Sequence, residues 1–566
     1  MTKRISALGM VLLTGLFLLV NRASYKGYFQ DDELDTLSWA PRIAPADYLK
    51  GALTPRFLPN NFRPVGHFYF YEAGHHFDLD FSKYIALLQL IHVLNFWLLW
   101  LVAQKLRAPP VAALLACLFF AFHMALFDAF WKPMYVYDVL CATFCLLSLL
   151  FWTQRRWVLS FAAFWLAYKA KELGVMMPAV LACYEFLLGE RRWKPLVPFF
   201  LASLSFGLQG LLLNPNKDND YTFRFSLSAL FRTSTYYAGR IFLVPYLGFL
   251  ALLAAVPGRN RRSWFGLAMA LLLFFPVLFL PGRIFSAYCY VPFMGLALAL
   301  SGVAESVGPV PVAIFLVLLA PLNLHELRAR RNVTLAEAEQ VRGWVTAVRN
   351  FARTSAPIDA VVWDGRIPNF ADWGEEGAIY YAFGKPDMKI AYADTPDARE
   401  LLSHARVAYI AWNPALKRAI VTAHGPGIPD LPYVDFSRAA PVWQLEQGWF
   451  DPEADYHWTA PVAVARLARP FNATHFALRV LVGPARLQAL GPVRLRVWLN
   501  QRELEPRQFV NPGWQDVQWD IPPDAPGTVR MKLEADPPFQ PPGHGPTLGI
   551  AVGAFGFVNA DSSPRK

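Results

Sequence analysis

Four acidic residues close to the N-terminus are the side chains best suited to chemistry. Asp31, Asp32, Glu33 and Asp35 lie within five positions, soon after the first apolar segment. Neighbouring carboxylates raise one another's proton affinity, so one of them in a partly buried site can serve as a general base near neutral pH. A metal-binding set and a solvated charged loop fit the same residues, and these interpretations stay open here.

Basic residues recur farther along the same loop and in the later polar loops, together with further acids. Arginine holds a phosphate through two parallel hydrogen bonds, and lysine holds one as a point charge. A lipid-phosphate ligand would satisfy both the basic and the acidic groups. The candidates in these loops are Arg63, Asp128, Lys132, Lys169, Lys171, Glu172, Arg283, Tyr288 and Tyr290.

The composition indicates that a membrane positions these residues. Of 566 residues, 55% are hydrophobic and 17% are charged, whereas soluble domains carry about 25% charged residues. This excludes a disordered chain, a collagen, a coiled coil and a wholly soluble enzyme. A membrane-spanning helix needs about 20 apolar residues. Residues 1–325 contain about eleven apolar segments that approach this length. They centre near 5–20, 83–104, 109–127, 136–154, 157–169, 173–188, 195–213, 236–256, 263–281, 286–302 and 308–324.

The formal net charge of +11 is mostly explained by loops on one side of the membrane. With Lys3 and Arg4 inside, every second loop is basic, as expected for cytoplasmic loops. We therefore expect no nucleic-acid partner, and an odd number of spans places the chain after about residue 325 outside. The basic loops contain Lys105 and Arg107; Arg155 and Arg156; Arg191, Arg192 and Lys194; and Arg259, Arg261 and Arg262.

A few polar side chains interrupt the apolar segments. His92 and Asn95 lie one helical turn apart, and we expect them to form hydrogen bonds between helices. The five cysteines lie in or beside apolar runs, without zinc-ligand spacing, so neither a disulfide framework nor a zinc module is expected.

The sequence of residues 326–566 predicts two soluble domains. In residues 326–440 we expect a small α/β domain, with a helix over 334–354 that begins at a capping box, and strands near 360–363, 379–382 and 407–412. In residues 441–566 we expect a β-sandwich, because runs such as 475–482 and 493–499 alternate apolar and basic residues. Four tryptophans of this region either belong to the core or stack on sugar rings: Trp449, Trp458, Trp514 and Trp519.

The order of several short motifs resembles that of the GT-C glycosyltransferases, in particular the branch similar to protein O-mannosyltransferases, which includes transmembrane mannosyltransferases with tetratricopeptide repeats. The resemblance covers most of residues 1–325. The stretch from Gly448 to Thr459 resembles the opening of the jelly-roll domains appended to bacterial membrane glycosyltransferases, which implies a jelly-roll-like β-sandwich at 441–566. The matching stretches are Asp31-Asp32, Arg63-Pro64, His92…Asn95, His123…Asp128, Lys171-Glu172-x-Gly174…Pro178 and Tyr288-x-Tyr290-x-Pro292.

This resemblance implies a multi-pass GT-C fold in a bacterial inner membrane and inverting transfer of a sugar from a polyprenyl-phosphate donor. It implies that Asp32 or Asp31 deprotonates a hydroxyl of a protein, lipid or glycan acceptor, and we choose Asp32. Asp128 would orient the acceptor or bind a divalent metal such as Mg or Mn, although no cofactor is certain. The phosphate would be held by Arg63, Lys132, Lys171 or Arg283, with Lys169 as a further candidate and Glu33, Glu172, Tyr288 and Tyr290 as other site residues.

The chain also departs from this family pattern. Ala287 stands where relatives carry an arginine, Met124 follows His123 in place of a proline, and no repeat of tetratricopeptide length is visible. These departures affect which sugar and which acceptor we expect more than they affect the expected class of reaction. Two other functions are weighed: a transporter or flippase for lipid-linked sugars, which predicts internal repeats, and a non-catalytic scaffold that binds envelope glycans.

Overall fold

The computed structural model describes residues 2–56, 62–213, 219–255, 260–393, 395–413, 417–425, 430–437, 442–453, 455–541 and 545–559. Arg259 of the last basic loop lies outside these residues. The chain divides into two compact units, Met1–Ala338 and Glu339–Lys566.

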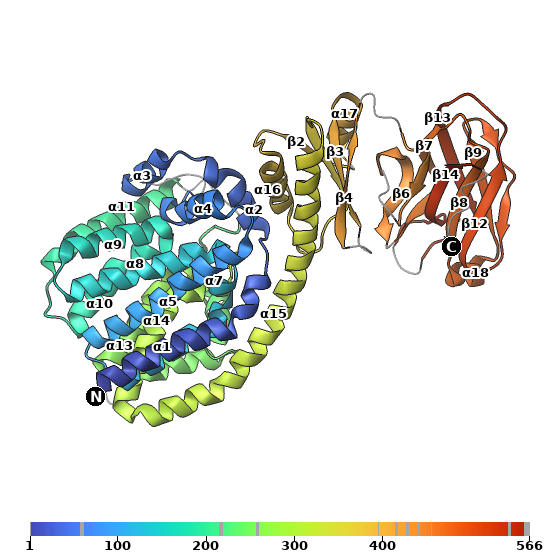
Figure 1. Cartoon of the computed structure of the whole chain (residues 1–566). Coiled ribbons are helices and arrows are strands. Elements are labelled where there is room, and N and C mark those ends of the chain that lie inside the picture. The colour runs from blue at the N-terminus through green and yellow to red at the C-terminus, as the bar shows by residue number, and fades with distance from the viewer. Residues whose placement is uncertain are drawn as a thin grey trace. The chain divides into compact units, whose positions relative to one another are not determined.

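The first unit is an α-helical bundle (Figure 1). Its helices are α1 (Thr2–Val20), α2 (Asp31–Trp39), α3 (Pro45–Leu53), α4 (Pro64–Phe77), α5 (Phe81–Lys105), α6 (Pro110–Phe122), α7 (Phe127–Trp131), α8 (Val136–Thr153), α9 (Trp157–Ala170), α10 (Met177–Leu187), α11 (Val197–Leu213), α12 (Leu227–Ile241), α13 (Arg261–Phe274), α14 (Tyr290–Val307) and α15 (Pro309–Thr354).

The bundle confirms a multi-pass helical membrane protein. Within the described residues, six helices are long and apolar enough to cross a membrane, and α6 with the helical turns after it makes a seventh if the pair, bent by 46°, is one span. The eleven expected segments are therefore not all long helices. The apolar stretch over 157–188 is divided into α9 and α10 by Lys171 and Glu172, and the segment near 236–256 breaks at Pro245 into α12 and the 3-10 helix η7 (Leu247–Ala255).

Small residues and a polar network hold the spans together. A side chain at Gly266 of α13 would meet the backbone of Ala299 in α14, so glycine permits this close helix contact. Elsewhere in the bundle, the Tyr290 hydroxyl lies 2.6 Å from His92 Nδ1 and accepts a hydrogen bond from Asn95 Nδ2 at 3.1 Å. The prediction of hydrogen bonds between helices is confirmed for both His92 and Asn95.

The second unit begins within α15, and a four-stranded sheet follows the end of this helix. Its strand order is β2-β1-β3-β4, with β4 alone antiparallel to its neighbour. Two sequence-based expectations are wrong here. Residues 379–382 belong to a helix instead of a strand, and no helix begins at the capping box near 334, because α15 runs unbroken through it. The elements are β1 (Ala360–Asp364), α16 (Asp372–Phe383), β2 (Lys389–Tyr392), α17 (Pro396–His404), β3 (Val407–Asn413) and β4 (Arg418–His424).

The C-terminal part is a ten-stranded antiparallel sheet with one apolar core, in keeping with the predicted β-rich domain. β9, the strand next to one end of the sheet, and β12, at the other end, contribute Leu495 and Trp519 to the same core, so the sheet curves around it. The expected strands at 475–482 and 493–499 coincide with β8 and β9. The elements are β5 (Tyr433–Asp435), η11 (Val442–Gln444), β6 (Leu445–Glu453), β7 (Tyr456–Arg469), β8 (His475–Val482), α18 (Pro484–Leu490), β9 (Val493–Leu499), β10 (Arg502–Glu503), β11 (Arg507–Phe509), β12 (Gly513–Asp520), β13 (Gly527–Asp536) and β14 (Ala551–Val558).

Candidate functional site

The acidic cluster forms the first turn of helix α2 rather than an extended loop. Glu33 is buried, and its carboxylate accepts the backbone N–H of Gln30 at 2.8 Å and that of Met134 at 3.1 Å. The first bond completes a capping box, and the second ties α2 to the 3-10 turn η4 (Pro133–Tyr135). Glu33 therefore fixes the position of its neighbours Asp31 and Asp32, of which Asp32 is exposed.

Burial raises the pKa of Glu33 to about 7, although its two backbone hydrogen bonds and the nearby Lys132 oppose the shift. Asp31 and Asp32 share this helical turn with Glu33, but Asp31 is half-buried and Asp32 is exposed. The three acids thus differ in environment: Glu33 has a structural role, and Asp32 is the acid that faces solvent.

Asp128 lies at the centre of a second cluster, between α6 and α8. Its Oδ2 accepts hydrogen bonds from Ser286 Oγ at 2.7 Å and from Arg330 at 3.2 Å, and Lys132 Nζ is 4.0 Å from its Oδ1. Arg330 also binds Glu326, one turn earlier on α15. Sequence analysis missed Arg330, although the spacing of Glu326 and Arg330 on a helix was visible in the chain.

Arg63 belongs to a third group, at the start of helix α4. Its Nε donates to Glu172 at 2.8 Å, and its guanidinium lies 5.4 Å from the centre of the Tyr137 ring. Burial would lower the pKa of Arg63, but the Glu172 carboxylate raises it above its usual value. Burial also lowers the pKa of His67 to about 3, so its neutral ring accepts the backbone N–H of Arg63 at 2.9 Å.

Lys171 forms a buried ion pair in the same group. Its Nζ lies 3.0 Å from Oδ2 of Asp138, in the first turn of α8, and 5.0 Å from the centre of the Tyr288 ring. Burial alone would lower the pKa of Lys171, but attraction by Asp138 raises it, so the ammonium stays charged. The other carboxylate oxygen of Asp138, Oδ1, is buried and has no hydrogen-bond partner among the described residues.

Two tyrosines connect these groups. The Tyr135 hydroxyl lies within electrostatic reach of Asp32, Glu33, Asp128 and Asp138. Tyr137 lies within reach of both Asp32 and Arg63. The fold therefore gathers these predicted site residues around η4: Asp32, Glu33, Arg63, Asp128, Lys132, Lys171, Glu172 and Tyr288.

Three of the predicted site residues contact other parts of the bundle and not the group around η4. Lys169 Nζ lies 3.4 Å from the Arg56 carbonyl and near an aromatic group on α9 and α11. Arg283 packs on the rings of Tyr221 and Phe285. Tyr290 is buried in the polar network between helices. We therefore leave these three residues out of the candidate site.

The described residues contain no group of three or more His, Cys, Asp or Glu side chains placed to hold a metal ion. In the clusters around Asp128 and around Arg63, the carboxylates face basic side chains instead. These two clusters can therefore exchange an internal ion pair for a bond to an anionic ligand, as a phosphate would require.

Comparisons with known proteins give only distant similarities. No family model and no curated protein matches the chain. Among solved structures, ArnT from Cupriavidus metallidurans bound to undecaprenyl phosphate is similar at 13% identity and a TM-score of 0.45, over 73% of this chain and 97% of that one. The arabinofuranosyltransferase AftD from Mycobacteria is similar at 13% identity and a TM-score of 0.40, over 98% of this chain and 59% of that one. The arabinosyltransferase EmbB from Mycobacterium smegmatis has 11% identity and a TM-score of 0.35, over 96% of this chain and 64% of that one.

Proposed function

We propose that the protein is a GT-C membrane glycosyltransferase that moves a sugar, with inversion, from a polyprenyl-phosphate donor to an extracytoplasmic acceptor hydroxyl. The observation that carries this proposal is that Asp32 and Arg63 both lie within electrostatic reach of one residue, Tyr137. A general base and a phosphate ligand are the two functions that such a transfer needs at one place.

Arg63 and Lys171 are the proposed ligands of the donor phosphate. Negative charge develops on the phosphate as the sugar leaves, and preorganised cations stabilise that charge. Glu172 and Asp138 hold the two cations in position when no donor is bound. The Glu172 side chain is 49% exposed, so it can move away from Arg63 when phosphate enters.

An apolar cavity on the same unit suits the hydrocarbon chain of the donor. It has a volume of about 390 Å³ and is lined by α1, α6 and α15, including Leu16, Phe119 and Leu327. Leu327 lies one helical turn before Arg330. The cavity thus ends close to the residues that surround Asp128.

Asp32 is the proposed base because it is exposed at the start of α2, where an acceptor hydroxyl can reach it. Glu33 accepts two backbone hydrogen bonds, and Asp128 is neutralised by Arg330 and held by Ser286. Asp128 with Arg330 is the proposed element that orients the acceptor. In the reaction, the acceptor oxygen bonds to the anomeric carbon, its proton passes to Asp32, and the bond between that carbon and the phosphate oxygen breaks.

The test uses the full chain in proteoliposomes with synthetic polyprenyl-phosphate hexoses and pentoses and a mixed hydroxyl acceptor fraction. Asp32→Asn should lower the transfer rate by about 10²–10⁴ while binding of undecaprenyl phosphate is retained. Asp47→Asn, at an exposed carboxylate of α3, is the matched control and should be fully active. An inactive Asp31→Asn beside a normal Asp32→Asn would move the base by one residue, and full activity in both would refute the mechanism.

A further inference from the structure

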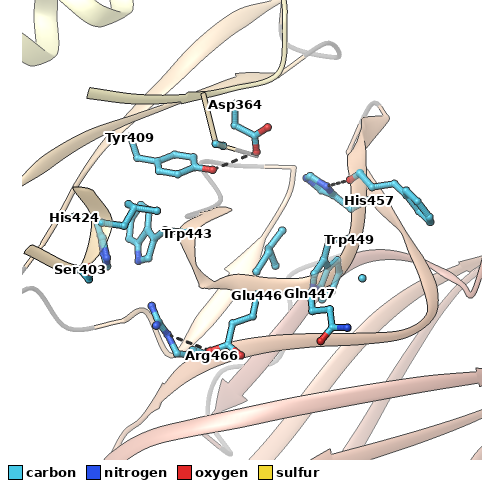
Figure 2. A pocket seen from close by; sticks show the side chains of 15 residues that line it. Asp364, Ser403, Tyr409, His424, Trp443, Glu446, Gln447, Trp449, His457 and Arg466 are labelled. Atoms are coloured by element: carbon cyan, nitrogen blue, oxygen red, sulfur yellow. Dashed lines mark hydrogen bonds and ion pairs between the residues drawn. The ribbon is translucent and has the colours of Figure 1, made fainter. Parts of the chain in front are cut away.

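The second unit contains a cavity of about 790 Å³ that the transfer reaction does not use. It lies where the four-stranded sheet meets the β6–β7 hairpin (Figure 2). Asp364, Tyr409 and His424 line it from β1, β3 and β4, and Trp443 and Trp449 line it from η11 and β6. Its volume falls within the range of about 300–1,000 Å³ that is usual for small-molecule sites.

Two buried polar atoms of this cavity lack a partner among the described residues. They are His424 Nδ1 and Trp443 Nε1, on side chains of residues that are each 8% exposed. The two rings pack together, with centroids 4.9 Å apart. A buried donor without a partner costs about 1–3 kcal/mol, so these atoms point to a ligand that brings hydroxyl groups.

The aromatic side chains of the cavity are held in place by their own contacts. Trp449 donates its Nε1–H to the Val464 carbonyl and stacks on Phe555. The Tyr409 hydroxyl donates to Asp364 at 3.3 Å, and its ring lies 5.9 Å from that of Trp443. Rings fixed in this way offer flat apolar surfaces at a low cost in conformational entropy.

The charges in the cavity do not favour an anionic ligand. Asp364 and Glu446 are acidic, and the one arginine or lysine in the described lining, Arg466, lies 3.8 Å from Glu446 and 3.5 Å from Asp430. An incoming phosphate or carboxylate would meet an excess of carboxylates. A neutral ligand with hydroxyl groups on its rim and an apolar face fits both the polar atoms and the rings.

We propose that this cavity binds a neutral saccharide. The C–H face of the sugar ring lies on the aromatic side chains, and its hydroxyls bond to His424, Trp443 and the exposed Gln447. The proposal does not depend on the transfer reaction, because binding needs neither a lipid donor nor Asp32.

The test measures binding to the purified full chain in detergent, by calorimetry and saturation-transfer NMR. The probes are neutral tetrasaccharides of glucose, mannose, galactose and arabinose, with tetragalacturonate as the anionic counterpart. We expect saturable binding of at least one neutral probe and weaker binding of tetragalacturonate. No saturable binding of any neutral probe, or a preference for tetragalacturonate, would overturn the proposal.

Variants then place the site. His424→Phe keeps the ring against Trp443 and removes the nitrogens, and Trp443→Phe removes the unpartnered N–H; each should raise Kd at least tenfold. Gln447→Ala changes an exposed side chain, so it leaves the fold intact, and it should raise Kd at least threefold. Trp514→Phe, on β12 outside the cavity, is the control and should bind normally. Unchanged binding in the three cavity variants, or a loss confined to Trp514→Phe, would refute this location.

Discussion

Replacing Lys171 with methionine separates the structural role of this residue from its proposed role in donor binding. The Lys171 and Asp138 side chains are 13% and 1% exposed, and their charged atoms are 3.0 Å apart. Coulomb's law at an effective dielectric constant of about 20 gives an attraction of about 5.5 kcal/mol at this distance. Desolvation offsets part of it, and removing one partner of a buried pair usually costs about 3–5 kcal/mol. Lys171→Met should therefore lower the free energy of unfolding by about 3–5 kcal/mol.

The assay is denaturant unfolding in lipid nanodiscs, followed by tryptophan fluorescence. Lys83→Met is the matched control, because Lys83 and Asp80 form an exposed pair at 3.3 Å, for which about 0–1 kcal/mol is expected. The double variant Lys171→Met/Asp138→Leu removes both charges and should recover most of the stability but not the binding of undecaprenyl phosphate. A Lys171→Met protein as stable as Lys83→Met would refute the buried ion pair, and normal binding in the double variant would refute its role with phosphate.

Three further predictions address pH, the missed arginine and topology. Glu33 binds its proton more tightly in the folded protein, with a pKa of about 7 against 4.5 for the free side chain. The stability that the protonated Glu33 contributes to the free energy of unfolding is therefore complete below pH 4.5 and is lost as the pH rises through about 7. The loss amounts to about 3 kcal/mol, and unfolding measured from pH 4 to 8 should show it in the wild type and in the control Glu72→Gln but not in Glu33→Gln. Arg330→Met should lower kcat/KM in the proteoliposome assay by about 10- to 100-fold, since a charge-assisted hydrogen bond is worth about 1.5–3 kcal/mol, and unchanged kinetics would remove Arg330 from the site. Alkaline phosphatase fused after Lys566 should be active, because the basic loops predict an extracytoplasmic C-terminus; activity of a cytoplasmic reporter there would reverse the orientation.

Local patterns in the sequence were sufficient for many of the elements. Long apolar runs predicted the membrane spans, and alternating side chains predicted β8 and β9, because each pattern depends only on neighbours along the chain. The sequence also predicted that His92 and Asn95 form hydrogen bonds with other helices, since lipid offers a polar side chain few other hydrogen-bond partners. The same reasoning failed at 379–382, where an aromatic run typical of a strand lies in helix α16.

The pairing of the site residues was decided by tertiary structure alone. Arg330 binds Asp128 across 202 positions, and Arg63 binds Glu172 across 109. Such contacts depend on how helices pack, and no periodicity along the chain encodes them. The sequence by itself determined which side chains could do chemistry at the membrane surface. Only the packing of the helices decided that Glu33 serves as a structural cap, that Lys169 and Arg283 make their contacts elsewhere, and that Tyr137 lies within electrostatic reach of both Asp32 and Arg63.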